Sequence, residues 1–472
     1  MEERIKEVIR EALKISVPSK AEYEYMNEIK EKVLHITQQH AKIYNADVMV
    51  CGSFAKNTWL PKKYEIDIFI LFSPKLERER LEELGLIIGK RVAEELNAEY
   101  VIEYAEHPYV RMKYREVQID LVPAYRVEKA SEKISAVDRT PFHTKYVIEK
   151  LKNVLNDEVR LLKKFMIANE IYGADAKTNG FSGYACELLI INYGTFLNTI
   201  KEVANWKPIT IIDIENYYSE NEKEILKKIF KNQPLIIIDP TDKDRNVAAA
   251  VSPYNYFKFI NLARKFLQNP SISFFEKREY KVVEGEEIIK YQIDRRTELI
   301  ILRFTRPKVV DDIIYPQMRR FANRIQSILE KYEFKILNKD VFCNEKFCYL
   351  VLEMEISKLP KIEKKKGPIF YDISNTKRFL EKYKNYITYV ENDRWYAEIP
   401  RKFVRAIDKI IDSLSKDEKT LREKGIPSFV AQQISKGFEI TNETSKILTF
   451  VREDNEFGRF LTKFLNKEKL EI

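Results

Sequence analysis

The chain has 472 residues, 44% of them hydrophobic and 12% aromatic, so it is long enough for roughly two to four domains with substantial cores. Lys and Arg outnumber Asp and Glu by 82 to 73, a mildly basic balance that is compatible with nucleic-acid binding but does not prove it. The 4 cysteines are widely spaced and contain no CxxC pair, which argues against a zinc site or a disulfide framework. No stretch resembles a signal peptide or a membrane span, so we expect a cytoplasmic protein without a membrane partner.

The N-terminal part of the chain predicts a small α/β unit. Residues 1–45 have the apolar spacing of two helices, and Ser19 is placed to cap the second helix. After them we predict a helix over residues 76–97 and strands over residues 48–51, 65–72, 100–104, 109–114 and 117–123. Pro123 is expected to end the last of these strands.

The middle of the chain, residues 141–270, predicts a mainly helical domain. It contains one buried strand at residues 235–240, followed by a polar loop over 241–246 and a helix that starts near Ala248. Residues 271–295 look like a domain boundary. The spacing then predicts a strand at 297–304, a helix at 311–332 and a hairpin within 341–356, an order typical of a ferredoxin-like module.

After a Lys-rich loop at 361–367, the tail predicts a strand near Trp395 and basic helices. The expected fold is therefore α+β and multidomain. We predict four domains: an α/β palm over 1–140, a helical domain over 141–270, a ferredoxin-like body over 271–360 and an α/β tail over 361–472.

The chemistry concentrates in the stretch from Gly52 to Phe72. Glu65 and Asp67 are two positions apart on a strand, so they share a face with Cβ atoms about 6–7 Å apart. Two neighbouring carboxylates repel each other unless a cation lies between them, and Mg²⁺ prefers such oxygen ligands. Asp120 is a lone acid on the polar face of a later strand and supplies a third ligand. The turn at Gly52-Ser53 offers hydrogen-bond donors to a phosphate.

Each of these features also has a simpler interpretation. A Gly-Ser pair is usually only a turn, and alternating acids usually mark a half-exposed strand. The combination of the turn, the paired acids and the third acid at this spacing favours a nucleotidyl-transfer site with two Mg²⁺ ions.

The same residues resemble the DNA-polymerase-β nucleotidyltransferase superfamily. Further segments are similar, in order, to the archaeal (class I) CCA-adding enzyme: Gly52–Leu60, Ala105–Val110, Ser135–His143, Arg160–Lys163, Ile171–Ala174, Gly180–Tyr184 and Arg245–Ala249. This resemblance implies an enzyme that adds C, C and A to the 3′ end of tRNA from CTP and ATP without a nucleic-acid template. It also implies repair of damaged tRNA 3′ ends.

The resemblance further assigns roles to individual residues. It places the catalytic and metal-binding acids at Glu65, Asp67 and Asp120, and the nucleotide contacts at Ser53, Lys56, His143, Lys163, Tyr172 and Arg245. Arg245 corresponds to an arginine used for base selection. Lys56 departs from the family pattern, which often has arginine there, so the charge is kept while the bidentate fork is lost.

The resemblance also implies a homodimer that binds the acceptor stem and T arm of tRNA through its C-terminal half. RNA duplexes are recognised mainly by shape, phosphate and 2′-hydroxyl contacts. Candidate phosphate contacts are Lys361, Lys364, Lys365, Lys366, Arg401, Lys402 and Arg405. Two alternatives remain open: a related nucleotidyltransferase, such as a poly(A) polymerase or an oligoadenylate synthase relative, and a non-catalytic RNA-binding protein.

Overall fold

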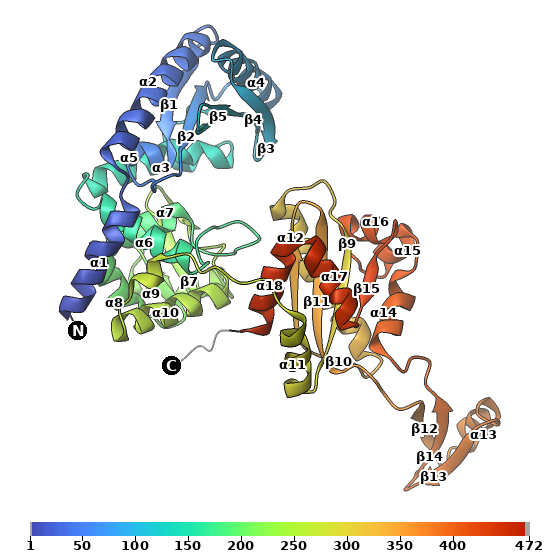
Figure 1. Cartoon of the computed structure of the whole chain (residues 1–472). Coiled ribbons are helices and arrows are strands. Elements are labelled where there is room, and N and C mark those ends of the chain that lie inside the picture. Colours follow the sequence, from blue (N-terminus) through green and yellow to red (C-terminus); the bar gives the residue numbers. More distant parts are fainter. Residues whose placement is uncertain (1, 468–472) are drawn as a thin grey trace. The chain divides into compact units, whose positions relative to one another are not determined.

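A computed structural model describes residues 2–467 of the chain (Figure 1). These residues form two compact units, one ending at Arg278 and the other starting at Glu279. Within the described residues, no helix combines the length and the apolar composition that a membrane crossing requires.

The first unit contains a five-stranded sheet in the order β1-β2-β5-β4-β3. Only β2 and β5 pair in parallel, and the other neighbours are antiparallel. The strands are β1 (Asp47–Cys51), β2 (Glu65–Phe72), β3 (Glu99–Tyr104), β4 (Pro108–Tyr114) and β5 (Val117–Tyr125). Ile66, Ile68 and Ile70 alternate along β2 and pack under α2 (Lys20–Lys42) and α4 (Arg78–Glu95). The opposite face of the sheet therefore carries the odd-numbered side chains of β2.

The predicted cap of the second helix is confirmed, because Ser19 and Glu22 form a reciprocal capping box at the start of α2. The predicted end of β5 at Pro123 is wrong, since the strand continues to Tyr125. β4 pairs with β5 only as far as Leu121, so Pro123 has a strand partner on one side alone, Ile70 of β2. A proline is tolerated at such an edge position because no ladder hydrogen bond is lost there.

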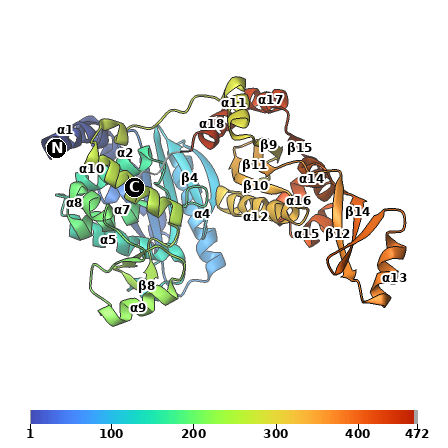
Figure 2. The same ribbon diagram turned by 90° about the horizontal axis from the view of Figure 1, so that it is seen from below.

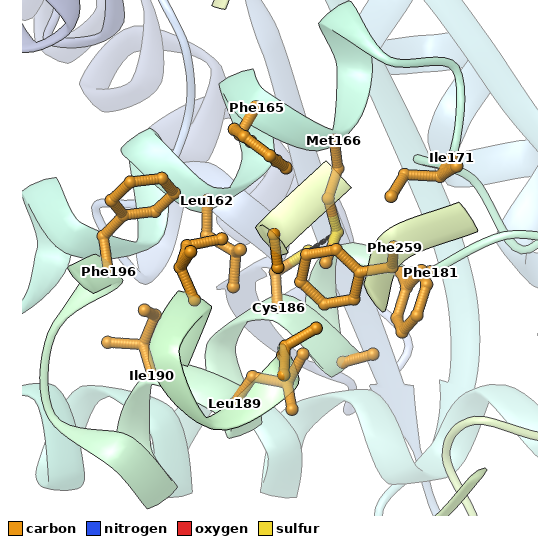
Figure 3. Packing of buried hydrophobic residues seen from close by; sticks show 14 of the residues in the cluster. Leu162, Phe165, Met166, Ile171, Phe181, Cys186, Leu189, Ile190, Phe196 and Phe259 are labelled. Carbon is orange, nitrogen blue, oxygen red and sulfur yellow. Dashed lines mark hydrogen bonds between the residues drawn. The ribbon is translucent and has the colours of Figure 1, made fainter. Parts of the chain in front are cut away.

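The rest of the first unit is mainly helical, as predicted. Its helices are α5 (Thr140–Leu151), α6 (Asn156–Ala168), α7 (Gly183–Tyr193), α8 (Phe196–Val203), α9 (Glu220–Ile229) and α10 (Pro253–Gln268). Figure 3 shows part of the core that these helices other than α9 share, to which α6 contributes Leu162 and Phe165 and α7 contributes Leu189 and Ile190. α1 (Glu2–Ser16) contributes Ile5 and Val8 to the same core.

A small sheet in the order β6-β7-β8 accompanies these helices. Its strands are β6 (Thr210–Ile212), β7 (Leu235–Asp239) and β8 (Asp242–Asn246). The predicted loop over 241–246 is therefore mostly a strand, because Pro240 and Thr241 form a tight turn that returns the chain along β7. The helix expected near Ala248 begins later, at Pro253, where Ser252 accepts a hydrogen bond as its N-cap.

The second unit is built on a four-stranded antiparallel sheet in the order β10-β11-β9-β15. The strands are β9 (Glu298–Thr305), β10 (Lys335–Cys343), β11 (Phe347–Ile356) and β15 (Glu439–Thr441). With α12 (Asp311–Glu330) between β9 and β10, this strand order is ferredoxin-like, as predicted. The sheet takes β15 from beyond residue 400, so both sides of the predicted boundary at residue 360 contribute to it.

The remaining helices of this unit surround the same sheet. They are α11 (Gly285–Arg295), α14 (Ala406–Leu414), α15 (Glu418–Glu423), α16 (Ser428–Ile434), α17 (Thr444–Glu453) and α18 (Asn455–Leu465). α17 and α18 cover the sheet through Phe450, Phe457 and Leu461, which pack on Tyr349 and Val351 of β11.

A separate three-stranded sheet in the order β12-β14-β13 lies between β11 and α14 in the sequence. It comprises β12 (Ile362–Ile369), β13 (Ile387–Glu391) and β14 (Arg394–Pro400), with α13 (Ile373–Lys382) against it (Figure 2). The predicted Lys-rich loop at 361–367 is therefore wrong: Lys364, Lys365 and Lys366 lie on β12 and pair with the strand at Trp395. Lys364, Lys365 and Lys366 are all exposed, which a polar strand at the edge of a small sheet allows.

Candidate active site

The three predicted acids lie on the two parallel strands at the centre of the first sheet. Asp67 of β2 is the direct register partner of Asp120 of β5, and Glu65 is two positions earlier on the same face. Burial, followed by the charges of Asp120 and Glu65, raises the pKa of Asp67 from its usual 3.8 to about 7. The fold therefore concentrates negative charge at this point at a cost in stability.

Gly52 lies directly against this acid pair. Its φ angle is +72°, and a Cβ atom at this position would lie 1.8 Å from Oδ2 of Asp67. Only glycine has both the conformational freedom and the space for this position. The turn into α3 (Gly52–Ala55) can therefore approach the acids closely.

We expect Gly52→Ala to destabilise the protein by at least about 2 kcal/mol, because the left-handed backbone and the clash with Asp67 both add cost. Gly194→Ala is the matched control: its φ is +86°, with nothing within 4 Å of the added Cβ. Thermal unfolding of both variants measures the difference. Equal losses of stability would show that the approach to Asp67 does not constrain this position.

Arg111 of β4 is a site residue that the sequence did not reveal. It pairs across the sheet with Asp120, and its Nε and Nη2 atoms donate to Oδ1 and Oδ2 of Asp120, each at 2.8 Å. Across residues 2–467, no three His, Cys, Asp or Glu side chains converge closely enough to hold a metal ion. Asp120 is instead directed to Arg111. Recognising Arg111 would have required pairing the hairpin of β4 and β5 in register.

Two of the predicted nucleotide contacts, Lys56 and Lys163, meet at a buried carboxylate. Glu187 of α7 is 1% exposed, and its Oε2 accepts from Nζ of Lys56 at 2.8 Å. Its Oε1 accepts from Nζ of Lys163 at 3.1 Å and from Oγ1 of Thr58 at 2.7 Å. Glu187 was not predicted, because it lies 131 positions from Lys56.

Two more of the predicted nucleotide contacts, His143 and Arg245, meet at a second buried carboxylate. Oδ2 of Asp239 accepts from Nε2 of His143 at 2.9 Å and from Nη1 of Arg245 at 2.7 Å. Its Oδ1 accepts from the hydroxyl of Tyr184 at 3.0 Å. Burial lowers the pKa of His143, so the ring is neutral near neutral pH and donates from Nε2.

Tyr184 links these two clusters. Its ring stacks on His143 with centroids 4.1 Å apart, and Nζ of Lys56 lies 5.1 Å from the ring centroid. Tyr172 lies close by, since a Cβ on Gly183 would be 2.9 Å from its hydroxyl. Ser53, in α3, is half-buried, and its carbonyl accepts from the backbone N–H of Thr58.

Three family models match consecutive parts of the chain. Residues 30–143 match a nucleotidyltransferase domain, 157–276 the second domain of tRNA nucleotidyltransferase, and 295–443 the C-terminal domain of CCA-adding enzyme. The first match covers the sheet and its three acids. The fold and the site therefore define a nucleotidyltransferase.

Curated relatives identify the family more closely. The chain is 39% identical to the CCA-adding enzyme of Methanocaldococcus jannaschii over 445 residues, which is 93% of this chain and 96% of the relative. It is 36% identical to that of Archaeoglobus fulgidus over 437 residues, covering 93% and 94%. The CCA-adding enzyme of Methanosarcina mazei is 34% identical over 470 residues, covering 97% and 99%. The chain belongs to the CCA-adding enzyme family, which confirms the resemblance described above.

Among the solved structures that are similar to this chain is a cytoplasmic RNA terminal U-transferase. Its TM-score is 0.44 and its identity 13%, covering 59% of this chain and 99% of that one. A crystal structure of Cid1 poly(U) polymerase has a TM-score of 0.43 and 14% identity, covering 58% and 99%.

Proposed function

We propose that this chain adds C, C and A to the 3′ end of tRNA from CTP and ATP, releasing pyrophosphate, and that it restores damaged 3′ ends in the same way. Its near full-length similarity to CCA-adding enzymes supports this function. One structural observation carries the chemistry. An acid pair that favours cations lies within electrostatic range of Lys56, which shares a buried carboxylate with Lys163. The carboxylates supply the negative charge that metal ions require, and the ammonium groups supply the positive charge that a triphosphate requires.

Carboxylate oxygens suit a divalent cation such as Mg²⁺, and Asp67 and Asp120 are register partners with Glu65 on the same face. These three acids are therefore the proposed ligands, with Asp120 exchanging Arg111 for the cation. The raised pKa of Asp67 supports this assignment, because a cation would offset both causes of it, the burial of the carboxylate and the neighbouring charges of Asp120 and Glu65. When bound, Mg²⁺ would activate the attacking 3′-hydroxyl and stabilise charge on the transferred phosphate. Arg111 donates to both oxygens of Asp120 and so fixes the direction of that carboxylate while no cation is bound.

The predicted nucleotide contacts have separate tasks. Lys56 and Lys163 neutralise triphosphate charge, and Ser53 and Tyr172 donate hydrogen bonds to phosphate or ribose oxygens. His143 and Arg245, held by Asp239, face the nucleotide from the helical part of the unit. In this scheme the guanidinium of Arg245 reads the acceptor atoms of a cytosine or adenine edge.

The second unit is proposed to hold the acceptor stem and T arm through backbone contacts, and the active protein is proposed to be a homodimer. The candidate phosphate contacts are the lysines of β12 together with Lys361, Arg401, Lys402 and Arg405. Among them, Lys364 pairs with Glu391 and Arg401 with Glu333, so these two would exchange partners on binding RNA. If the set acts together, tRNA affinity should fall steeply with salt.

The direct test supplies labelled CTP and ATP to a tRNA that lacks its 3′ CCA. Incorporation that stops after three nucleotides supports the proposal, whereas a long A tract would support a poly(A) polymerase. A Glu65→Ala, Asp67→Ala double variant that kept full incorporation would contradict the catalytic assignment and favour a non-catalytic RNA-binding protein.

We expect Arg245→Ala to alter the choice between CTP and ATP more than the overall rate. Loss of one recognition group of this kind is worth about 1–3 kcal/mol, or roughly 5-fold to 150-fold in discrimination. The kcat/KM ratio for the two nucleotides, measured on tRNA ending in CC, is the readout. Unchanged discrimination would remove Arg245 from base selection.

A further inference from the structure

Glu187 is a buried carboxylate to which neither the sequence pattern nor the acid site assigns a role. Its three bonded partners come from two parts of the first unit: Lys56 and Thr58 follow α3 of the palm, whereas Lys163 belongs to α6 of the helical part. Nζ of Lys163 also donates to Oγ1 and to the carbonyl oxygen of Thr58, at 2.9 and 3.2 Å. The cluster therefore fixes the palm loop to the helices.

The charges in this cluster do not balance. Lys56 and Lys163 are 7% and 3% exposed, and within residues 2–467 each forms its ion pair with the same carboxylate, that of Glu187. Two buried ammonium groups thus share one negative charge. Burying unbalanced charge is costly, so such an arrangement is retained where an anion is to be bound.

We propose that Glu187 is the positioning residue for the triphosphate: it orients Lys56 and Lys163 together and leaves one net positive charge for the phosphates. This inference rests on the proposed function. It also accounts for the lysine at position 56, because a single ammonium donates to Oε2 while Thr58 and Lys163 occupy Oε1.

The protonation state of Lys163 makes this role testable, because it should make nucleotide binding depend on pH. Burial lowers the pKa of Lys163, while the charge of Glu187 opposes that effect. The other groups around it are Lys56, Thr58, Cys186 and Tyr172, and burial raises the pKa values of Cys186 and Tyr172, which keeps both neutral. Burial also raises the pKa of Glu187, but Lys56 and Lys163 outweigh burial and hold it at about 2. Glu187 is therefore charged at every working pH.

The test is Glu187→Gln, assayed for steady-state incorporation of CTP and ATP and for CTP binding without tRNA. Without the carboxylate, Lys163 loses its proton at a lower pH and its charge is no longer available to the triphosphate. We expect the ratio of variant to wild-type KM to be several-fold higher at pH 9 than at pH 6.5, with kcat changing much less. The dissociation constant for CTP should follow the same trend.

Two further variants separate positioning from stability. Glu187→Asp keeps the charge and should restore a KM ratio that does not change with pH. Glu353→Gln removes another fully buried carboxylate, which is ion-paired with Arg295 in the second unit. This variant should lower thermal stability without a pH-dependent KM. If Glu187→Gln folds poorly, Thr58→Val removes one donor from the cluster and should raise KM for both nucleotides.

The proposed function and the positioning role of Glu187 can be refuted by different results. A wild-type protein that does not extend tRNA with CTP and ATP would refute the proposed function. An active wild type combined with a pH-independent KM ratio for Glu187→Gln would refute the positioning role alone.

Discussion

Asp67→Asn is expected to stabilise the protein while eliminating its activity. Replacing the acid removes the cost of burying its charge and the repulsion from Asp120 and Glu65. The free energy of unfolding at pH 8, measured without divalent metal, should therefore increase by on the order of 2 kcal/mol. Incorporation of CTP and ATP should fall by at least about a hundredfold, the scale of losing one preorganised electrostatic group.

The pH dependence of this effect follows from the pKa of Asp67, which is about 7 in the folded chain and 3.8 in its usual environment. Below pH 3.8 the carboxyl is protonated in both the folded and the unfolded chain, so it costs folding nothing. As the pH rises from 3.8 to about 7, the unfolded chain ionises first, and stability from this group is lost. The advantage of the Asn variant should therefore grow across this window and stay constant above it.

Asp47→Asn is the matched control on the same sheet, because Asp47 is exposed and paired with Arg126. It should change stability by less than about 0.5 kcal/mol and leave incorporation intact. Thermal unfolding of both variants between pH 5 and 8 measures how the stability of each depends on pH. A wild-type-like pH profile for Asp67→Asn would mean that neither burial nor the neighbouring acids disfavour the charge of Asp67 in the folded protein.

The acid site was predictable because its signals are local. Glu65 and Asp67 share a face by strand periodicity alone, and Ser19 with Glu22 follows a short-range capping rule. The ferredoxin-like order was also visible in the succession of strand, helix and hairpin, although its fourth strand, β15, comes from far along the chain.

The carboxylates that organise the cations were not predictable in this way. Glu187 lies 131 positions from Lys56, and Asp239 lies 96 positions from His143. Neither acid lies in a recognisable sequence motif, and only tertiary packing brings each of them to its partners. Likewise, the lysines of β12 appeared to form a loop because a half-exposed edge strand has no apolar pattern of its own.

The second large effect is expected for Asp239→Asn. Asp239 is 0% exposed and accepts hydrogen bonds from His143, Tyr184 and Arg245, and from the backbone and hydroxyl of Thr241. The NH₂ of an asparagine would point at groups that themselves donate hydrogen bonds. The guanidinium of Arg245 would also lose its carboxylate partner. Breaking a buried pair in this way costs about 3–5 kcal/mol.

The sign of the pH dependence is opposite to that of Asp67. Burial raises the pKa of Asp239, but the hydrogen bond and charge of His143, with Thr241 and Arg245, outweigh it and hold the pKa below its usual 3.8. The carboxylate therefore contributes stability above pH 3.8, and this contribution is lost as the pH falls through the lower folded value. The deficit of Asp239→Asn should be constant between pH 7 and 8 and grow as the pH falls toward 5, because loss of the carboxylate lowers the pKa of His143 further. Asp244→Asn, on the same hairpin but exposed, should have little effect, and equal losses for both variants would show that Asp239 does not organise this cluster.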